Sequence, residues 1–306
     1  MKTVFHNINY KSSDIFNLYP LYDLHVGHIG CNEALIKAYV SHIAADPMGL
    51  VVLGGDLIDG ISQADRRYDP AQLAPWCRDE LGDPVNIIES QIIQAGKLLA
   101  PIADKVIGML LGNHERTPIK RLSIPVFKRL ALTTASYRQD DINPYDPKAP
   151  APDFALGYHG YIGLTFQRPH HSSRVLIYAH HGYGGGRTPG GKLNKLSNML
   201  ADWPDADIVL AGHVHDLLDL PVDRKVPDWP HARRDGAGST KKYPRVAAFC
   251  GTFLSGDAPE TPTGWPRTSY AVEKGYPERP IGGLKIRIKP ETRHLEVVKP
   301  VLELRG

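Results

Sequence analysis

Short apolar runs alternate with helix-like segments through most of this chain, and the alternation limits the folds open to it. The strand-like runs are "IFNLYPLYDLH", "GLVVLGGD", "KVIGMLLGNHE", "RVLIYAHHG", "ADIVLAGHVH" and "RVAAFCGTFL". Apolar residues at helical spacing mark three segments, which are "CNEALIKAYVSHIAAD", "VNIIESQIIQAGKLLAPIAD" and "GGKLNKLSNMLADW". Strand followed by helix, repeated along the chain, predicts an α/β sheet with helices on its faces.

The end of the chain departs from this pattern. The stretch "GGLKIRIKPETRHLEVVKPVLEL" alternates apolar and polar residues on both sides of a "PETR" turn signal, which predicts an antiparallel hairpin that closes one sheet. Loop insertions are expected near 62–84, 132–153 and 221–244, the last two rich in proline and charge. Because strand patterns for one sheet lie on both sides of these insertions, we expect a single domain over residues 1–306.

Composition and cysteine usage exclude several classes of protein. A chain of 306 residues with 42% hydrophobic and 23% charged residues fits an ordinary globular protein with a large core. Its three cysteines are odd in number and lack metal-type spacing, which argues against a disulfide framework and favours a reducing compartment. No apolar run reaches membrane-spanning length and no leader is evident. We therefore expect a cytoplasmic protein with no membrane partner, and the oligomeric state stays open.

Polar side chains gather where the apolar runs end. They are Asp23 and His25, Asp56, Asn113 and His114, His180 and His181, and His213 and His215. Each group alone has an ordinary explanation as a turn or a hydrogen-bonded pair, but their repeated placement at strand ends favours one shared site. The carboxyl ends of strands in an α/β sheet form a common rim where ligands bind. Nitrogen and oxygen donors in this mixture suit divalent transition metals rather than calcium.

The ordered motifs "DLH", "GGD", "GNHE", "HHG" and "GHVH" resemble those of the calcineurin-like metallophosphoesterase superfamily, over residues from about 18 to 216. The resemblance implies an α/β fold of four layers, an α/β/β/α sandwich in which two mixed sheets are flanked by helices. It implies that one metal is bound by Asp23, His25, Asp56 and His215. It implies that the other is bound by Asp56, Asn113, His180 and His213, so that Asp56 bridges the pair. Within "HHG", His180 is favoured because it stands directly at the strand end, and His181 is the alternative or a substrate contact.

This site predicts hydrolysis of phosphate esters by in-line attack of a metal-bridging hydroxide. His114 is the candidate acid for the leaving group, with orientation of the attacking water as its alternative role. Glu115 and Asp59 are expected to position metal ligands. Manganese is the favoured metal, with zinc, nickel or iron(II) as alternatives. Iron(III) is disfavoured because Asp59 occupies the position at which the purple acid phosphatases carry a tyrosine.

The substrate is less constrained by the sequence. A phosphodiesterase or nuclease-like enzyme is favoured, and the alternatives are a phosphomonoesterase, including a protein phosphatase, or a non-catalytic scaffold on the same fold. Arg116, Arg187 and His181 are the candidate substrate contacts. Basic residues beside Trp229 in the 221–244 segment would suit a nucleotide or nucleic-acid strand, although a solvated loop is the favoured explanation.

Overall fold

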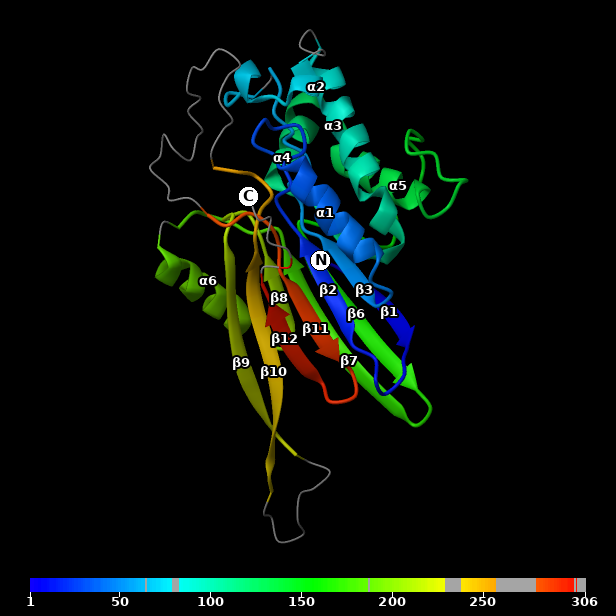
Figure 1. Cartoon of the computed structure of the whole chain (residues 1–306), viewed down its shortest axis with the longest axis vertical. Coiled ribbons are helices and arrows are strands. Elements are labelled where there is room, and N and C mark those ends of the chain that lie inside the picture. The colour runs from blue at the N-terminus through cyan, green and yellow to red at the C-terminus, as the bar shows by residue number, and fades with distance from the viewer. Residues whose placement is uncertain are drawn as a thin grey trace.

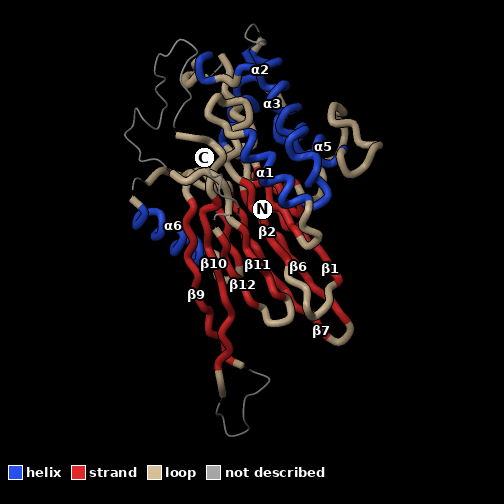
Figure 2. Tube along the Cα trace, in the orientation of Figure 1, coloured by secondary structure: helices blue, strands red, loops and turns tan. Residues whose placement is uncertain are grey.

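The computed structural model describes residues 1–63, 65–78, 83–186, 188–228, 238–256, 279–299 and 301. Two six-stranded sheets pack face to face, with helices outside both of them (Figures 1 and 2). Parallel and antiparallel pairs occur in both sheets. The expected four-layer α/β/β/α sandwich is confirmed.

The first sheet has the strand order β1-β6-β7-β8-β10-β9. Its strands are β1 (Lys2–Asn9), β6 (His159–Arg168), β7 (His171–His180), β8 (Ile208–Ala211), β9 (Leu217–Pro227) and β10 (Thr240–Cys250). The second sheet has the order β12-β11-β2-β3-β4-β5. Its strands are β2 (Phe16–Leu21), β3 (Gly49–Leu53), β4 (Val106–Leu110), β5 (Ala155–Gly157), β11 (Lys285–Lys289) and β12 (His294–Val298).

The helices cover the outer faces of the two sheets. They are α1 (Glu33–Ala44), α2 (Pro75–Arg78), α3 (Pro84–Leu99), α4 (Asn113–Leu122), α5 (Val126–Ser136) and α6 (Pro189–Asp202), with 3-10 turns at Pro70–Gln72 and Ala100–Lys105. Figure 1 shows α6 beside β9 and β10, whereas α1, α3 and α5 lie over the second sheet. The three helices expected from apolar spacing correspond to α1, α3 and α6.

Apolar residues on alternating strand positions build three core layers. In β2, Leu18 packs between the two sheets and its neighbour Tyr19 packs against the helices on the second sheet. In β8, Leu210 faces the other sheet and Val209 packs with Leu196 of α6. Because side chains alternate across a strand, a strand buried on both faces reads as a continuous apolar run, as the sequence of β8 does.

The C-terminal hairpin is confirmed, because β11 and β12 pair antiparallel and β11 also pairs with β2. The prediction of a surface loop over 221–244 is wrong for the described part of that segment. Residues 221–227 belong to β9 and residues 240–244 to β10, which pair antiparallel from Leu217–Cys250 out to Pro227–Thr240. Pro221 and Pro227 are tolerated because β9 lies at the sheet edge, where one side of the strand needs no ladder hydrogen bonds. Pro244 precedes the part of β10 that pairs with β8.

Two further findings concern cysteines and helices. Cys31, Cys77 and Cys250 are free thiols, as the argument against a disulfide framework predicted. Within the described ranges, no helix combines the length and the apolar character needed to cross a bilayer.

Candidate metal centre

The candidate ligands converge at the carboxyl ends of five strands. Loops after β2, β3, β4, β7 and β8 carry three overlapping groups, which are Asp23, His25 and His215; His25, Asp56 and His114; and Asp56, His181 and His213. Within each group the donor atoms lie within 4.8 Å of one another. Asp56 is shared between the second and third groups, and His25 between the first and second. The three groups therefore form one continuous cluster.

In the first group, two imidazole nitrogens and a carboxylate oxygen face one another. The Nε2 atoms of His25 and His215 lie 3.1 Å apart, and the His215 Nε2 atom is 3.8 Å from Oδ1 of Asp23. Asp23 Oδ1 is buried and has no hydrogen-bond partner within the part of the chain that the structure describes. A buried carboxylate oxygen without a donor is costly unless a cation binds it. Two imidazoles and a carboxylate in this arrangement fit a divalent transition metal.

The third group lies on the other side of Asp56. Oδ1 of Asn113 is 3.0 Å from His181 Nε2 and 2.7 Å from His213 Nδ1, and His181 Nε2 is 3.3 Å from Asp56 Oδ2. The other ring nitrogen of His181 lies 2.9 Å from the Gly54 carbonyl oxygen. A carbonyl accepting from Nδ1 is the usual support of a metal-binding imidazole, because it leaves Nε2 for the metal.

The structure distinguishes the two histidines of the "HHG" stretch. His181, expected as the alternative ligand or a substrate contact, is buried beside Asp56 in the third group, whereas His180, expected as the ligand, lies outside the cluster. The ring of His180 packs against Tyr158 and Tyr183, and its Nδ1 atom accepts the Gly182 N–H at 2.8 Å. The physical reason is the alternation of side-chain direction at the end of β7, which turns adjacent histidines to opposite sides.

Backbone conformation is unusual at the candidate ligands. Left-handed φ values of +50° to +69° occur at Asp23, His25, Asp56, His213 and His215. Non-glycine residues adopt this region infrequently, and such strain gathers at functional sites where surrounding contacts hold it. These positions follow directly after β2, β3 and β8.

Close approach of two loops depends on Gly112. A Cβ atom built there would lie 2.1 Å from Oδ1 of Asp56, inside any allowed contact. The neighbouring Gly55 has φ +85°, and a Cβ on it would lie 2.6 Å from the Gly112 nitrogen. Only glycine at these two positions allows the loops after β3 and β4 to meet around Asp56.

Glu115 fixes the loop that carries Asp56. Its buried carboxylate accepts backbone N–H groups of Asp56 at 3.0 Å, Leu57 at 2.6 Å, Ile58 at 3.3 Å and Gly112 at 2.8 Å. Burial, followed by the nearby Asp56 carboxylate, raises the pKa of Glu115. The contacts give this side chain the positioning geometry expected from the sequence.

His114 lies at the outer side of the cluster. Its backbone N–H donates to Asp56 Oδ1 at 2.8 Å, and its Nδ1 atom contacts the Asp59 carbonyl oxygen. This leaves Nε2 facing outward, 3.4 Å from Nη1 of Arg67. The buried Asp59 carboxylate stands 3.8 Å from Nδ1 of His25 and 3.7 Å from Nδ1 of His114. His114 can therefore reach a bound molecule only through Nε2, which here lies within hydrogen-bond distance of Arg67, and its role as acid stays a prediction.

The local electrostatics favour a cation. Burial lowers the pKa of His25 to about 4, so its ring is neutral near neutral pH. Burial opposes ionisation of Asp56, but His114, His181 and His25 outweigh it and hold the pKa of this carboxyl below its usual range. Burial also opposes charge on His181, yet Asp56 and Asp23 raise the pKa of His181 to about 10. Because metal ligands must be deprotonated, a cation bound here would displace the proton of His181.

The candidate substrate contacts are less well placed. Arg116 lies on the exposed side of α4, and Arg187 falls outside the described residues. Arg67, which the sequence interpretation did not single out, is the arginine that contacts His114. The only available signal was its place in the insertion directly after "GGDLIDG".

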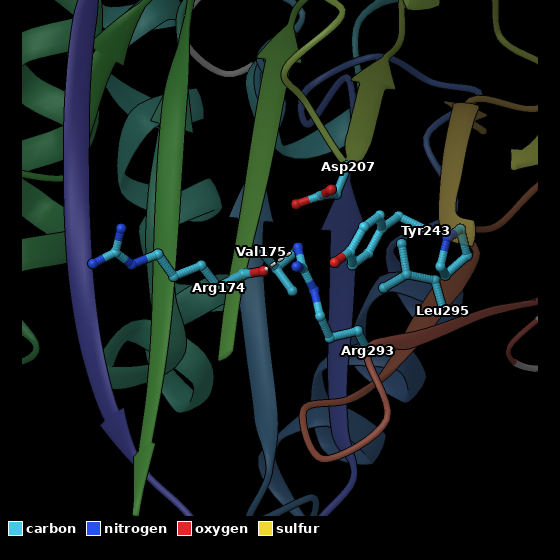
Figure 3. A pocket seen from close by; sticks show the side chains of 7 residues that line it. Arg174, Val175, Asp207, Tyr243, Arg293 and Leu295 are labelled. Carbon is cyan, nitrogen blue, oxygen red and sulfur yellow. Dashed lines mark hydrogen bonds between the residues drawn. The ribbon is translucent and has the colours of Figure 1, made fainter. Parts of the chain in front are cut away.

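A second, small hollow lies away from the metal cluster, and polar side chains line it. Figure 3 shows Arg174, Asp207, Tyr243 and Arg293 around it, at the ends of β7 and β10 remote from the metal cluster. The Arg293 guanidinium stacks 4.4 Å from the centre of the Tyr243 ring and donates to the Arg174 carbonyl oxygen at 3.2 Å. Asp207 accepts the Leu176 N–H at 2.9 Å and lies 3.6 Å from Nη2 of Arg224, so Arg293 and Asp207 already have partners within the protein.

Comparisons with known proteins give distant matches only. No protein-family model and no curated protein matches the sequence. Among solved structures, GAP50, the anchor in the inner membrane complex of Plasmodium, matches with 12% identity and a TM-score of 0.41, over 90% of this chain and 81% of that one. A predicted phosphoesterase from Streptococcus pneumoniae TIGR4 has 10% identity, a TM-score of 0.29 and coverage of 90% and 83%. A metallophosphoesterase from Sphaerobacter thermophilus has 13% identity, a TM-score of 0.31 and coverage of 92% and 87%.

Two of these three structures are phosphoesterases by name, the class that the motif order resembles. Their TM-scores are below 0.5, so the case for a metal centre rests on the side chains described above.

Proposed function

We propose that this protein is a metal-dependent phosphoesterase whose active site is the strand-end cluster around Asp56. The observation that carries the proposal is the position of the Asp56 carboxylate. It lies between two sets of donors, His25 with the neighbouring Asp23 and His215 on one side, and His181 and His213 on the other. A carboxylate flanked by two donor sets is suited to bridging two close divalent cations.

Each cation would have its own ligands. Asp23, His25 and His215 with Asp56 would hold one, and Asn113, His181 and His213 with Asp56 would hold the other. Bound divalent ions supply Lewis acidity for phosphate-ester hydrolysis, since they neutralise charge on phosphoryl oxygens and lower the pKa of water. We propose manganese as the metal, from the mixed nitrogen and oxygen donors.

The remaining residues act on the substrate or on the ligands. His114, held through its Nδ1 atom by the Asp59 carbonyl, presents Nε2 to donate a proton to the departing alkoxide. Glu115 keeps the Asp56 loop against the start of α4 through four backbone hydrogen bonds. The strained, buried donor set favours an enzyme over a non-catalytic scaffold, because a scaffold gains nothing from it.

Within this class we propose a phosphodiesterase or nuclease-like enzyme that acts on a nucleotide or nucleic acid. The basis for this proposal is the order of the motifs along the chain. The basic arms of the β9–β10 hairpin do not contribute to this part of the proposal. Ten residue steps separate Cys250, at the site end of β10, from Thr240, a distance of roughly 30 Å in an extended strand. Lys241 and Lys242 therefore lie too far from the cluster to hold a substrate there.

The test uses protein stripped by a chelator and reloaded with manganese. Substrates are bis-p-nitrophenyl phosphate, p-nitrophenyl phosphate, a cyclic nucleotide and single-stranded DNA. We expect hydrolysis on reloading, strongest with a diester, and a loss of more than about 100-fold in Asp56→Asn, since even indirect partners of ligands are worth 10- to 100-fold. Turnover retained in Asp56→Asn with full metal content, or no hydrolysis of any substrate by the loaded wild type, would contradict the proposal. Preference for the monoester would move the assignment to a phosphomonoesterase.

A further inference from the structure

The insertion after β3 brings a guanidinium to the outer edge of the metal cluster. Arg67 lies in this insertion, and its Nη1 atom is 3.4 Å from Nε2 of His114, the ring nitrogen that faces outward. The Arg67 side chain is 42% exposed, whereas those of His114 and Asp65 are 13% and 5% exposed. A solvent-accessible guanidinium thus stands beside the nitrogen proposed to meet the leaving group.

Arg67 is held in place by a buried carboxylate. Asp65 accepts from Nε of Arg67 at 3.1 Å and from Nη2 at 2.9 Å, and it also accepts the Arg67 backbone N–H at 2.9 Å. The Asp65 side chain is only 5% exposed. This two-point contact occupies one edge of the guanidinium and directs the Nη1 edge toward His114.

The loop that carries this pair is itself tied to the metal-binding loops. The Ala74 N–H donates to the Gly27 carbonyl oxygen at 2.8 Å, and the Ile29 N–H donates to the Gln72 carbonyl oxygen at 2.7 Å. At the other end, the Gly60 N–H donates to the Gln91 side chain at 2.8 Å. The two ends of the insertion are therefore held against the loop after β2 and against α3.

We propose that Arg67 binds the phosphoryl group of the substrate beside His114, and that Asp65 is the residue that positions it. A phosphoryl group entering the cluster meets the carboxylates of Asp56 and Asp59, and a fixed guanidinium offsets their charge. The hydrogen bonds to Asp65, followed by the charges of Asp65, Asp59 and Asp56, raise the pKa of Arg67 although burial opposes this, so its charge is permanent. Arginine presents paired N–H donors to phosphate oxygens, which a lysine cannot do.

A purely structural role explains the arrangement less well. An ion pair with one exposed partner stabilises a fold only slightly. The contact to His114 is a long hydrogen bond of 3.4 Å at the exposed edge of the site, so it adds little to stability. An anion between Arg67 and His114 would give both groups a favourable partner.

The inference rests on the proposed function, and the test separates the two. Variants Arg67→Ala, Arg67→Lys and Asp65→Asn are compared with Arg66→Ala, a matched control because Arg66 is the exposed neighbour. Titration calorimetry measures the binding of inorganic phosphate to the manganese-loaded protein. The value of kcat/KM is determined with bis-p-nitrophenyl phosphate, and elemental analysis gives the metal content. The calorimetric comparison needs no turnover, so it decides the role of Arg67 even if hydrolysis is absent.

We expect Arg67→Ala to keep its metal, to bind phosphate about 10- to 100-fold more weakly and to lose kcat/KM by a similar factor, the range of one charge-assisted contact. Arg67→Lys recovers part of the loss, and Asp65→Asn raises KM more than it lowers kcat. Arg66→Ala stays within about twofold of the wild type. Phosphate binding by Arg67→Ala within about twofold of the wild type, or an equal loss in Arg66→Ala, would overturn the inference. Absence of phosphate binding by the wild type would overturn it as well.

Discussion

His180 and His181 are adjacent and chemically identical, and their surroundings alone give them different roles. The fully buried His181 has its Nδ1 atom against the Gly54 carbonyl and its Nε2 atom between Asn113 and Asp56. His180 packs among aromatic rings, and burial lowers its pKa to about 4. One of the two is a candidate metal ligand and the other is part of an aromatic cluster.

Replacing each histidine by alanine distinguishes these roles. We expect His181→Ala to bind manganese at least about 10-fold more weakly, since it removes a donor, and to lose phosphoesterase activity. His180→Ala is the control, because it removes the same side-chain volume at the adjacent position. We expect this variant to have lower thermal stability but full metal content. Titration calorimetry with manganese and elemental analysis measure the difference. Loss of metal from His180→Ala, with metal retained in His181→Ala, would restore the sequence-based assignment.

Among the larger elements, α6 is held to the first sheet by a side chain of β10. Arg245, which is 9% exposed, donates to the carbonyl oxygens of Leu200 at 3.0 Å, Trp203 at 2.8 Å and Ala206 at 2.7 Å. The last carbonyls of a helix have no partner inside the helix, and a cation at this end is also favoured by the helix dipole. One arginine therefore satisfies the end of α6 and the turn that leads into β8.

Arg245→Met tests this role. It keeps much of the apolar stem but removes the arginine N–H donors. The Trp203 carbonyl keeps the Ala206 N–H, so two carbonyls lose their donor. The free energy of unfolding should therefore fall by roughly 2–6 kcal/mol, because each unsatisfied buried carbonyl costs about 1–3 kcal/mol. Arg245→Lys should also be destabilised, but less than Arg245→Met, since one ammonium group cannot reproduce the forked N–H donors of a guanidinium. Urea denaturation gives the values, and manganese binding should be unchanged. A decrease smaller than about 1 kcal/mol would show that water satisfies these carbonyls.

Some of the strands could be predicted from the sequence and others could not. The strands that bring ligands to the site are short, apolar and followed by a polar motif, so their local sequence pattern is sufficient to predict them. The β9 arm, with Pro221 and charged residues, has the composition of a loop, and only its pairing with β10 makes it a strand. The strands β1 and β6 were not predicted. In β1, Val4 is buried in the core between the two sheets and Phe5, on the other face, is 72% exposed.

The functional site could be predicted only in part, for a similar reason. Asp23, His25, Asp56, Asn113, His213 and His215 were predicted to converge because each follows a strand. Sequence spacing does not show which of two adjacent histidines points inward, since that depends on the pleat at the last residue of β7. It also does not show that Arg67, in a loop without periodicity, returns to His114. These contacts are tertiary, and local patterns carry no information about them.

Considered as a whole, the sandwich is held at the end opposite the metal cluster by a polar contact between its two sheets. Glu291, in the turn between β11 and β12, accepts from Arg168 Nε at 3.0 Å and Nη2 at 2.6 Å. It also accepts from the Tyr10 hydroxyl at 3.0 Å, and His171 Nδ1 lies 2.6 Å from the same hydroxyl. Tyr10, Arg168 and His171 lie at or next to the ends of β1, β6 and β7, so this cluster joins the first sheet to the second.

This contact gives stability a defined pH dependence. The hydrogen bonds from Arg168, and secondarily from Tyr10, lower the pKa of Glu291 from 4.5 to about 2 although desolvation opposes this. A carboxyl whose pKa is lower in the folded state stabilises the fold above its unfolded value and loses that contribution as the pH falls. The contribution of Glu291 is therefore complete above about pH 4.5 and disappears between there and about pH 2.

Glu291→Gln should accordingly lower the Tm near neutral pH by about 1–3 °C, a small effect because both charged partners are about one-third exposed and solvent screens them. The difference in Tm between wild type and variant should shrink below about pH 4.5 and vanish near pH 2, because protonation of Glu291 removes the same charge as the substitution. Glu296→Gln is the control, since Glu296 pairs with Arg287 at 3.3 Å within the second sheet alone. Calorimetric scans at several pH values measure both variants. A Tm difference for Glu291→Gln that stays constant or grows as the pH falls would show that the carboxylate does not hold the two sheets together.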